Sequence, residues 1–213
     1  MKKILIIILT IISIYLIYSC LYKQKVNYVS ISDNSIFIDG KNYNDYLKDY
    51  LIKRNRLNDF NTTFINNTVS NIYKDIINNR TIRDNNQDYY FKKVLRESDI
   101  VIINVGMEEI VENFNNDFFP RLYSNIEKLI KEIIKYAKGK IVFLGFYNPN
   151  NYYDARIDEY FCNMDIELNS LMMKYGISYI DLYSIVKNNS HDGSYINSYI
   201  HKKIASILEF YLE

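Results

Sequence analysis

The chain has 213 residues, a formal net charge of +1 at pH 7 and a sequence pI of about 7.6. This length favours a single domain that can bury a substantial core. Its 26 basic and 25 acidic residues are spread evenly, without the basic stripe that is typical of nucleic-acid binding, so we expect no nucleic-acid partner. We also expect no cofactor and no metal.

The N-terminal segment has the pattern of an export signal. Two lysines precede an apolar stretch, residues 4–17, that is short for a membrane span. It ends in Ile17-Tyr18-Ser19-Cys20, which resembles a bacterial lipobox with an atypical tyrosine. We predict that residues 1–19 are a signal peptide, that Cys20 is lipidated, and that residues 20–25 form a tether. An uncleaved anchor is the alternative, and both place the domain on the extracytoplasmic face of the cell membrane.

Beyond the tether, apolar patterns typical of strands alternate with helical ones. Strands are predicted at residues 26–31, 60–65, 100–105, 141–146 and 177–181. Helical periodicity is found at residues 44–57, 69–77, 89–96, 118–137, 157–175, 181–186 and 199–211, and residues 80–88 suit a small hairpin. Such alternation is typical of a parallel sheet covered by helices. We therefore predict one three-layer α/β/α domain over residues 26–213.

The run at residues 100–105 is the expected centre of this sheet. Its β-branched residues show no polar alternation, which indicates a strand buried on both faces. Gly106 ends the run, and Glu108 and Glu109 follow in the first turn of a helix, where the helix dipole favours acidic residues. Open α/β folds bind ligands at this edge of the sheet. We expect Gly106 to Glu109 to border the functional site.

In the order and spacing of its sequence blocks, the chain resembles the SGNH (GDSL-type) hydrolases over about residues 26–213. Ser32-Asp33-Asn34 stands where the family has Gly-Asp-Ser, and Asn66-Asn67-Thr68 falls at the second block. Gly106 to Glu109 matches the Gly-x-Asn-Asp block, and residues 192–197 fall where Asp-x-x-His is expected. The resemblance implies a flavodoxin-like fold with a five-stranded parallel sheet. It also implies an esterase site with a serine nucleophile, glycine and asparagine oxyanion donors, and an Asp–His pair.

The residues at the catalytic positions nevertheless differ from those of the family. The resemblance places Asn34 at the nucleophile, Asn66 at the oxyanion glycine, Glu108 at the oxyanion asparagine and Tyr195 at the base. An amide is no practical nucleophile, and a tyrosine with a pKa near 10 accepts a proton poorly at neutral pH. A carboxylate would repel the forming oxyanion. We therefore predict an impaired or inactive esterase, in which the positions that keep the family's residues are Asp33, Gly106 and Asp192.

Two alternatives follow from neighbouring residues. A shifted arrangement of Ser35, His191 and Asp192 would give an active carboxylic ester hydrolase. Carboxylates near aromatic rings would instead suit a cell-envelope glycan, a small hydroxylated ligand or a hard cation. Two carboxylates across a cleft are also compatible with glycoside hydrolysis. The residues expected to converge are Asp33, Glu108, Glu109 and Asp192, with Tyr147, Tyr152, Tyr153 and Tyr195, although Glu109 is better explained as part of a helix N-terminus.

Two remaining residues are expected to be structural. After Cys20 the chain has one further cysteine, Cys162, so no disulfide is available within the domain. Cys162 lies in a helical pattern and is predicted to pack in the core. His201 lies on the last predicted helix, where a packing role is favoured over catalysis.

Overall fold

The computed structural model describes residues 8, 10–13, 25–33, 40–64, 68–84, 87–113, 118–147, 155–189 and 196–212. Cys20 and most of the signal segment and tether lie outside these ranges, so the domain boundaries at residues 19 and 25 stay predictions. Within the ranges, no helix combines the length and apolarity needed to cross a membrane.

The central sheet has five parallel strands in the order β2-β1-β5-β6-β7. Every residue of the middle strand is buried, as expected for an apolar strand with helices on both faces. The predicted fold is therefore confirmed, with the central strand at residues 100–104. The bounds are β1 (Val26–Ser32), β2 (Leu57–Phe64), β5 (Ile100–Asn104), β6 (Lys140–Leu144) and β7 (Ser178–Ile180).

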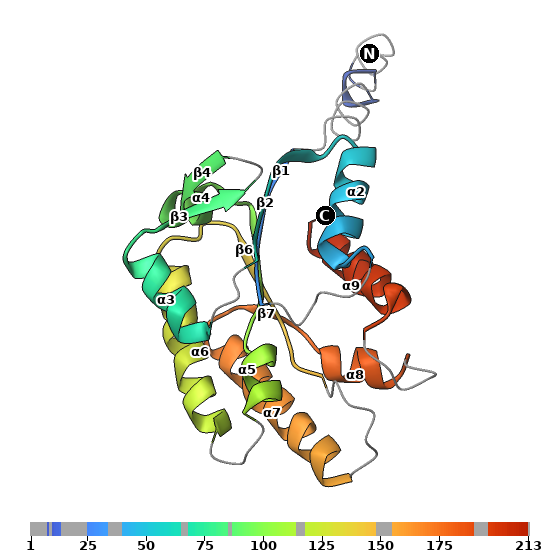
Figure 1. Cartoon of the computed structure of the whole chain (residues 1–213). Coiled ribbons are helices and arrows are strands. Elements are labelled where there is room, and N and C mark those ends of the chain that lie inside the picture. The colour runs from blue at the N-terminus through green and yellow to red at the C-terminus, as the bar shows by residue number, and fades with distance from the viewer. Residues whose placement is uncertain are drawn as a thin grey trace.

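Helices cover both faces of the sheet and complete the three layers (Figure 1). The first and last helices of the domain, α2 (Tyr43–Lys53) and α9 (Ser198–Tyr211), pack together on one side. On the other side, α3 (Val69–Ile77) packs against α6 (Phe118–Ile134). The remaining helices are α4 (Phe91–Glu97), α5 (Met107–Glu112), α7 (Ala155–Lys174) and α8 (Leu182–Lys187).

Two predicted boundaries are wrong for local reasons. The helical pattern predicts a helix that continues to Leu57, but α2 ends at Lys53, because Asn55 takes a left-handed φ of 52° and Leu57 pairs with Val26 in the sheet. The predicted hairpin is confirmed as β3 (Thr81–Asp84) and β4 (Gln87–Tyr90). It includes Tyr89 and Tyr90, so α4 begins two residues later than the helical pattern indicated.

A buried polar cluster lies between β1 and the helices α2 and α9. The hydroxyl of Tyr28 donates to Oδ1 of Asn44, and burial raises the pKa of Tyr43 to about 12. The Tyr43 and His201 rings lie 6.2 Å apart. Burial lowers the pKa of His201 to about 4, and neither ring nitrogen has a hydrogen-bond partner among the described residues. His201 is therefore a neutral packing residue at pH 7. Cys162 is a half-buried free thiol.

Candidate functional site

The end of β1 is tied to the first turn of α5 by one carboxylate. Oδ2 of Asp33 accepts hydrogen bonds from the backbone N–H of Gly106 (2.8 Å) and of Glu108 (3.3 Å). The backbone N–H of Asp33 donates to the carbonyl of Asn104 at 3.0 Å. Asp33 is only 2% exposed, so these are buried, charge-assisted bonds. They hold two turns of the carboxyl edge in a fixed relation.

Gly106 is required by both its backbone and its surroundings. It is the N-cap residue of α5 and has a φ of 99°, a conformation that side chains disfavour. A Cβ at this position would lie 3.3 Å from the side chains of Leu122 and Phe146. A glycine cap offers no side-chain acceptor to the first turn, so the carboxylate of Asp33 takes that role.

The two glutamates of this turn have different environments. Glu108 is half-buried, and its carboxylate has no hydrogen-bond or ion-pair partner within the described ranges. Oε2 of Glu109 instead accepts a hydrogen bond of 2.6 Å from the backbone N–H of Val69, the first residue of α3. Burial raises the pKa of Glu109, the Val69 bond opposes that rise, and the nearby charge of Asp33 adds to it. Glu109 therefore joins α5 to α3 and is a structural residue, in agreement with the preference for a helix N-terminus.

Among the described residues, this edge of the sheet therefore offers acceptors in place of donors. The N–H groups of Gly106 and Glu108 are already bonded, while the carboxylate of Glu108 has no donor within the described part of the chain. Such an arrangement suits hydroxyl or ammonium donors and opposes a forming oxyanion. Across the residues that the structure describes, no three His, Cys, Asp or Glu side chains are grouped as metal ligands. Tyr147, near which the carboxylates are expected to converge, is 4% exposed and packs in the core.

The structure thus brings together three of the predicted site residues, Asp33, Gly106 and Glu108. The other proposed site positions lie outside the described residues, and their roles stay predictions. They are Asn34, Ser35, Asn66, His191, Asp192 and Tyr195, with the neighbouring Tyr152 and Tyr153.

A second polar pair near this edge was not predicted. The Tyr179 hydroxyl of β7 donates to Oδ1 of Asp165, which is 7% exposed on α7. Burial raises the pKa of Asp165 to about 6, the Tyr179 bond opposes the rise, and the charge of Asp181 adds to it. A Cβ at Gly145 would collide with the Tyr179 hydroxyl. Asp165 lies four residues after the buried Phe161, and this helical spacing could have indicated that Asp165 is buried as well.

No protein-family model matches this chain, and no curated protein sequence matches it significantly. Solved structures do share its fold. The lipase Lip_vut3 from a goat rumen metagenome has a TM-score of 0.66 and 13% identity, covering 89% of this chain and 100% of its own. The acetylxylan esterase Axe2 from Geobacillus stearothermophilus has a TM-score of 0.63 and 11% identity, with 89% and 95% covered.

A third neighbour is LAE5, described as an alpha/beta hydrolase enzyme from the metagenome of Lake Arreo, Spain. It has a TM-score of 0.61 and 14% identity, covering 90% of this chain and 97% of its own. At these identities the likeness concerns the fold. The chain therefore shares the fold of these lipases and esterases, which agrees with the fold that its sequence blocks predicted.

Proposed function

We propose that this chain is a membrane-anchored, extracytoplasmic protein in which an esterase fold has lost most or all of its hydrolytic activity and serves to bind a ligand. The ligand class is a hydroxylated molecule, such as a cell-envelope glycan. It binds at the carboxyl edge of the sheet, next to Asp33 and Glu108.

One observation carries the proposal: the turn that should supply oxyanion donors presents a carboxylate. The backbone donors of Gly106 and Glu108 are engaged by Asp33, and the side chain at position 108 is acidic. Loss of a single oxyanion donor lowers an acyl-transfer rate by about 10²–10³. Carboxylates that lack donors form strong, charge-assisted hydrogen bonds to hydroxyl groups, which favours binding over ester cleavage.

The structural neighbours support the same interpretation. Axe2 is an acetylxylan esterase, and its solved forms include catalytic mutants in which a serine and a histidine are replaced by alanine. On the family resemblance, the nucleophile and base positions of this chain hold Asn34 and Tyr195. Neither residue type performs nucleophilic or general-base catalysis readily.

Restoring the family's residues tests the loss of activity. The combined variant Asn34→Ser, Asn66→Gly, Glu108→Asn and Tyr195→His should release acetate from p-nitrophenyl acetate faster than the natural chain. The same variant with Glu108 retained is the control, and its rate should be about 10²–10³ lower. A folded combined variant that stays inert would refute the assigned positions.

Titration calorimetry tests the binding role. A xylo-oligosaccharide is a suitable first probe, because Axe2 acts on acetylated forms of such sugars. Glu108→Gln should weaken binding, whereas Glu112→Gln, an exposed position on the same helix, should leave it unchanged. Equal effects of the two changes would show that Glu108 does not contact the sugar.

A further inference from the structure

We propose that the amino edge of the sheet rests on an anionic phospholipid surface and turns the candidate site away from the membrane. The contacting residues, which we call the membrane corner, are Lys25, Ile52, Lys53, Arg54 and Phe210. The inference rests on the proposed anchoring of the N-terminal segment and deepens the proposed function, because it restricts where the ligand is found.

The membrane corner forms where three elements meet. The rings of Tyr43 and His201 lie 6.2 Å apart near the starts of α2 and α9. Beyond the end of α2, Nη2 of Arg56 donates to the carbonyl of Leu212, which caps α9, at 2.6 Å. The backbone N–H of Val26 donates to the carbonyl of Arg56 at 2.6 Å. The two helices therefore run in the same direction and end beside the start of β1 (Figure 1).

Apolar and basic side chains are exposed together at this corner. Ile52 is 56% exposed and Phe210 is 78% exposed, each in the last turn of its helix. Lys25, Lys53 and Arg54 are exposed beside them. Aromatic and aliphatic side chains flanked by lysine and arginine are the pattern of surfaces that lie in a lipid headgroup layer. Basic residues there are attracted to anionic lipids.

Two acidic side chains near this edge, Asp99 and Glu97, have partners of their own. Oδ2 of Asp99 accepts a hydrogen bond of 2.8 Å from the backbone N–H of Asn27. Oε1 of Glu97 lies 3.9 Å from Nζ of Lys93 on α4. Asp99 precedes β5, and Glu97 and Lys93 belong to α4, whereas Lys53 and Arg54 lie at the end of α2. Lys25, Lys53 and Arg54 therefore place three exposed basic side chains where the chain enters the domain.

The length of the tether favours the same orientation. Residues 20–26 reach at most about 22 Å when fully extended, and about 13 Å as a relaxed flexible chain. From Val26 to Ser32, β1 rises about 20 Å. Asp33, which follows β1, could therefore approach the membrane only if the tether were stretched nearly to its limit along the domain. The membrane corner meets the membrane with a relaxed tether.

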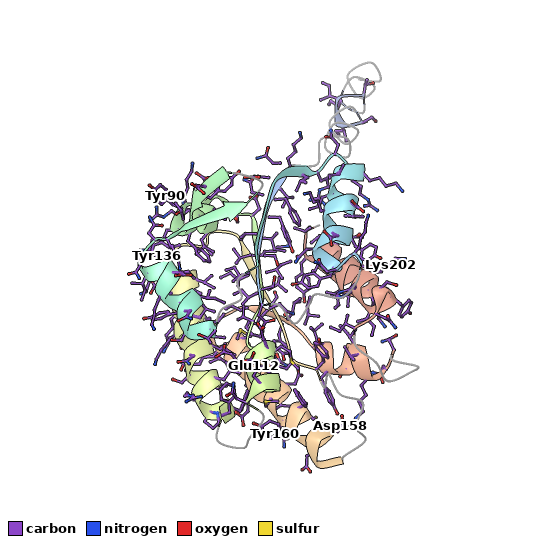
Figure 2. The ribbon with its side chains drawn as sticks, in the orientation of Figure 1. Tyr90, Glu112, Tyr136, Asp158, Tyr160 and Lys202 are labelled. Carbon is purple, nitrogen blue, oxygen red and sulfur yellow. The ribbon has the colours of Figure 1, made fainter. Side chains whose placement is uncertain are left out.

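The candidate site consequently opens toward the cell envelope. Glu112, at the end of α5, lies at the end of the molecule opposite the start of β1, together with Asp158 and Tyr160 of α7 (Figure 2). A ligand at this end comes from the material outside the membrane. Glycans of the envelope fit this position, and acyl chains of the supporting bilayer do not.

Photo-crosslinking of the full chain tests the orientation. A photoreactive phenylalanine analogue is placed at position 210 in one variant and at position 199 in the other. Tyr199 is the matched control, because it is 59% exposed at the opposite end of the same helix, about 16 Å away along the axis. A third variant carries the analogue at position 112. Each is bound to vesicles of equal parts phosphatidylcholine and phosphatidylglycerol, sedimented and irradiated.

We expect lipid adducts at position 210 to exceed those at positions 199 and 112 by about tenfold or more. Equal adducts at all three positions, or more at 199 and 112, in sedimented protein would overturn the orientation and leave the anchoring intact. Failure to sediment with the vesicles would refute the anchoring and the orientation together. The sugar titration would still test the binding role by itself.

Discussion

Replacing Asp33 with alanine should destabilise the domain by about 3 kcal/mol. The substitution removes the acceptor of two backbone hydrogen bonds, from Gly106 at 2.8 Å and from Glu108 at 3.3 Å. A hydrogen bond to a charged group contributes about 1.5–3 kcal/mol, and the longer bond counts toward the lower limit. For a domain of this size, 1 kcal/mol shifts the melting temperature by about 2–4 °C. We therefore expect the melting temperature to fall by about 9 °C.

Urea unfolding followed by circular dichroism measures this loss. Asp33→Asn keeps an acceptor oxygen without its charge, so its cost should be about 1 kcal/mol. Glu108→Ala is the control, since the Glu108 carboxylate has no partner among the described residues, and its cost should be within about 0.5 kcal/mol. If Asp33→Ala costs no more than Glu108→Ala, with unchanged m values, Asp33 does not hold the two turns together.

Four further substitutions test the packing and the buried charges. Gly106→Ala should lower the free energy of unfolding in urea by about 2 kcal/mol or more, since φ is 99° and two side chains lie 3.3 Å from the added Cβ. Gly176→Ala, where φ is 67° and nothing lies within 4 Å of the added Cβ, should lower it by about 1 kcal/mol.

Burial lowers the pKa of His201 to about 4, so the unfolded chain binds more protons than the folded chain between about pH 4 and 6.5. The free energy of unfolding therefore falls as the pH falls through this range. His201→Phe should remove up to about 3 kcal/mol of this loss. Burial raises the pKa of Asp165 to about 6, so protonated Asp165 stabilises the fold below about pH 4, and this contribution is lost as the pH rises through 6. Asp165→Asn should be more stable than the natural chain by up to about 3 kcal/mol at pH 7. At pH 4 the variant should have no such advantage. Each variant is unfolded in urea at pH 4 and at pH 7. If a variant differs from the natural chain by the same free energy at both pH values, the pKa shift assigned to that residue is contradicted.

The fold could be predicted because its strands are encoded locally. The apolar run of β5 requires cover on both faces, and the alternation of strands with helices leaves few topologies. The end of α2 could not be predicted in the same way, because the apolar spacing continues to Leu57 while the helix ends at Lys53, before Asn55 takes a left-handed conformation. Periodicity alone does not distinguish a continuing helix from a turn that leads into a strand.

The contacts of the site could not be predicted from local patterns. Asp33 and Gly106 are 73 residues apart in sequence, and their hydrogen bond exists because β1 and β5 are neighbours in the sheet. Glu109 caps α3 across a separation of 40 residues. The aromatic residue Tyr147 follows a buried strand and packs in the core, and its position in the chain does not reveal this burial.

The rate of ester hydrolysis by the full-length protein tests the central claim, that this site binds without cleaving. Purified protein is incubated with p-nitrophenyl acetate and with an acetylated xylo-oligosaccharide, and released acetate is measured against buffer. We predict little or no rate above the uncatalysed reaction. Hydrolysis above that background that is abolished by Ser35→Ala or His191→Ala would contradict the claim and establish an active esterase with a shifted triad.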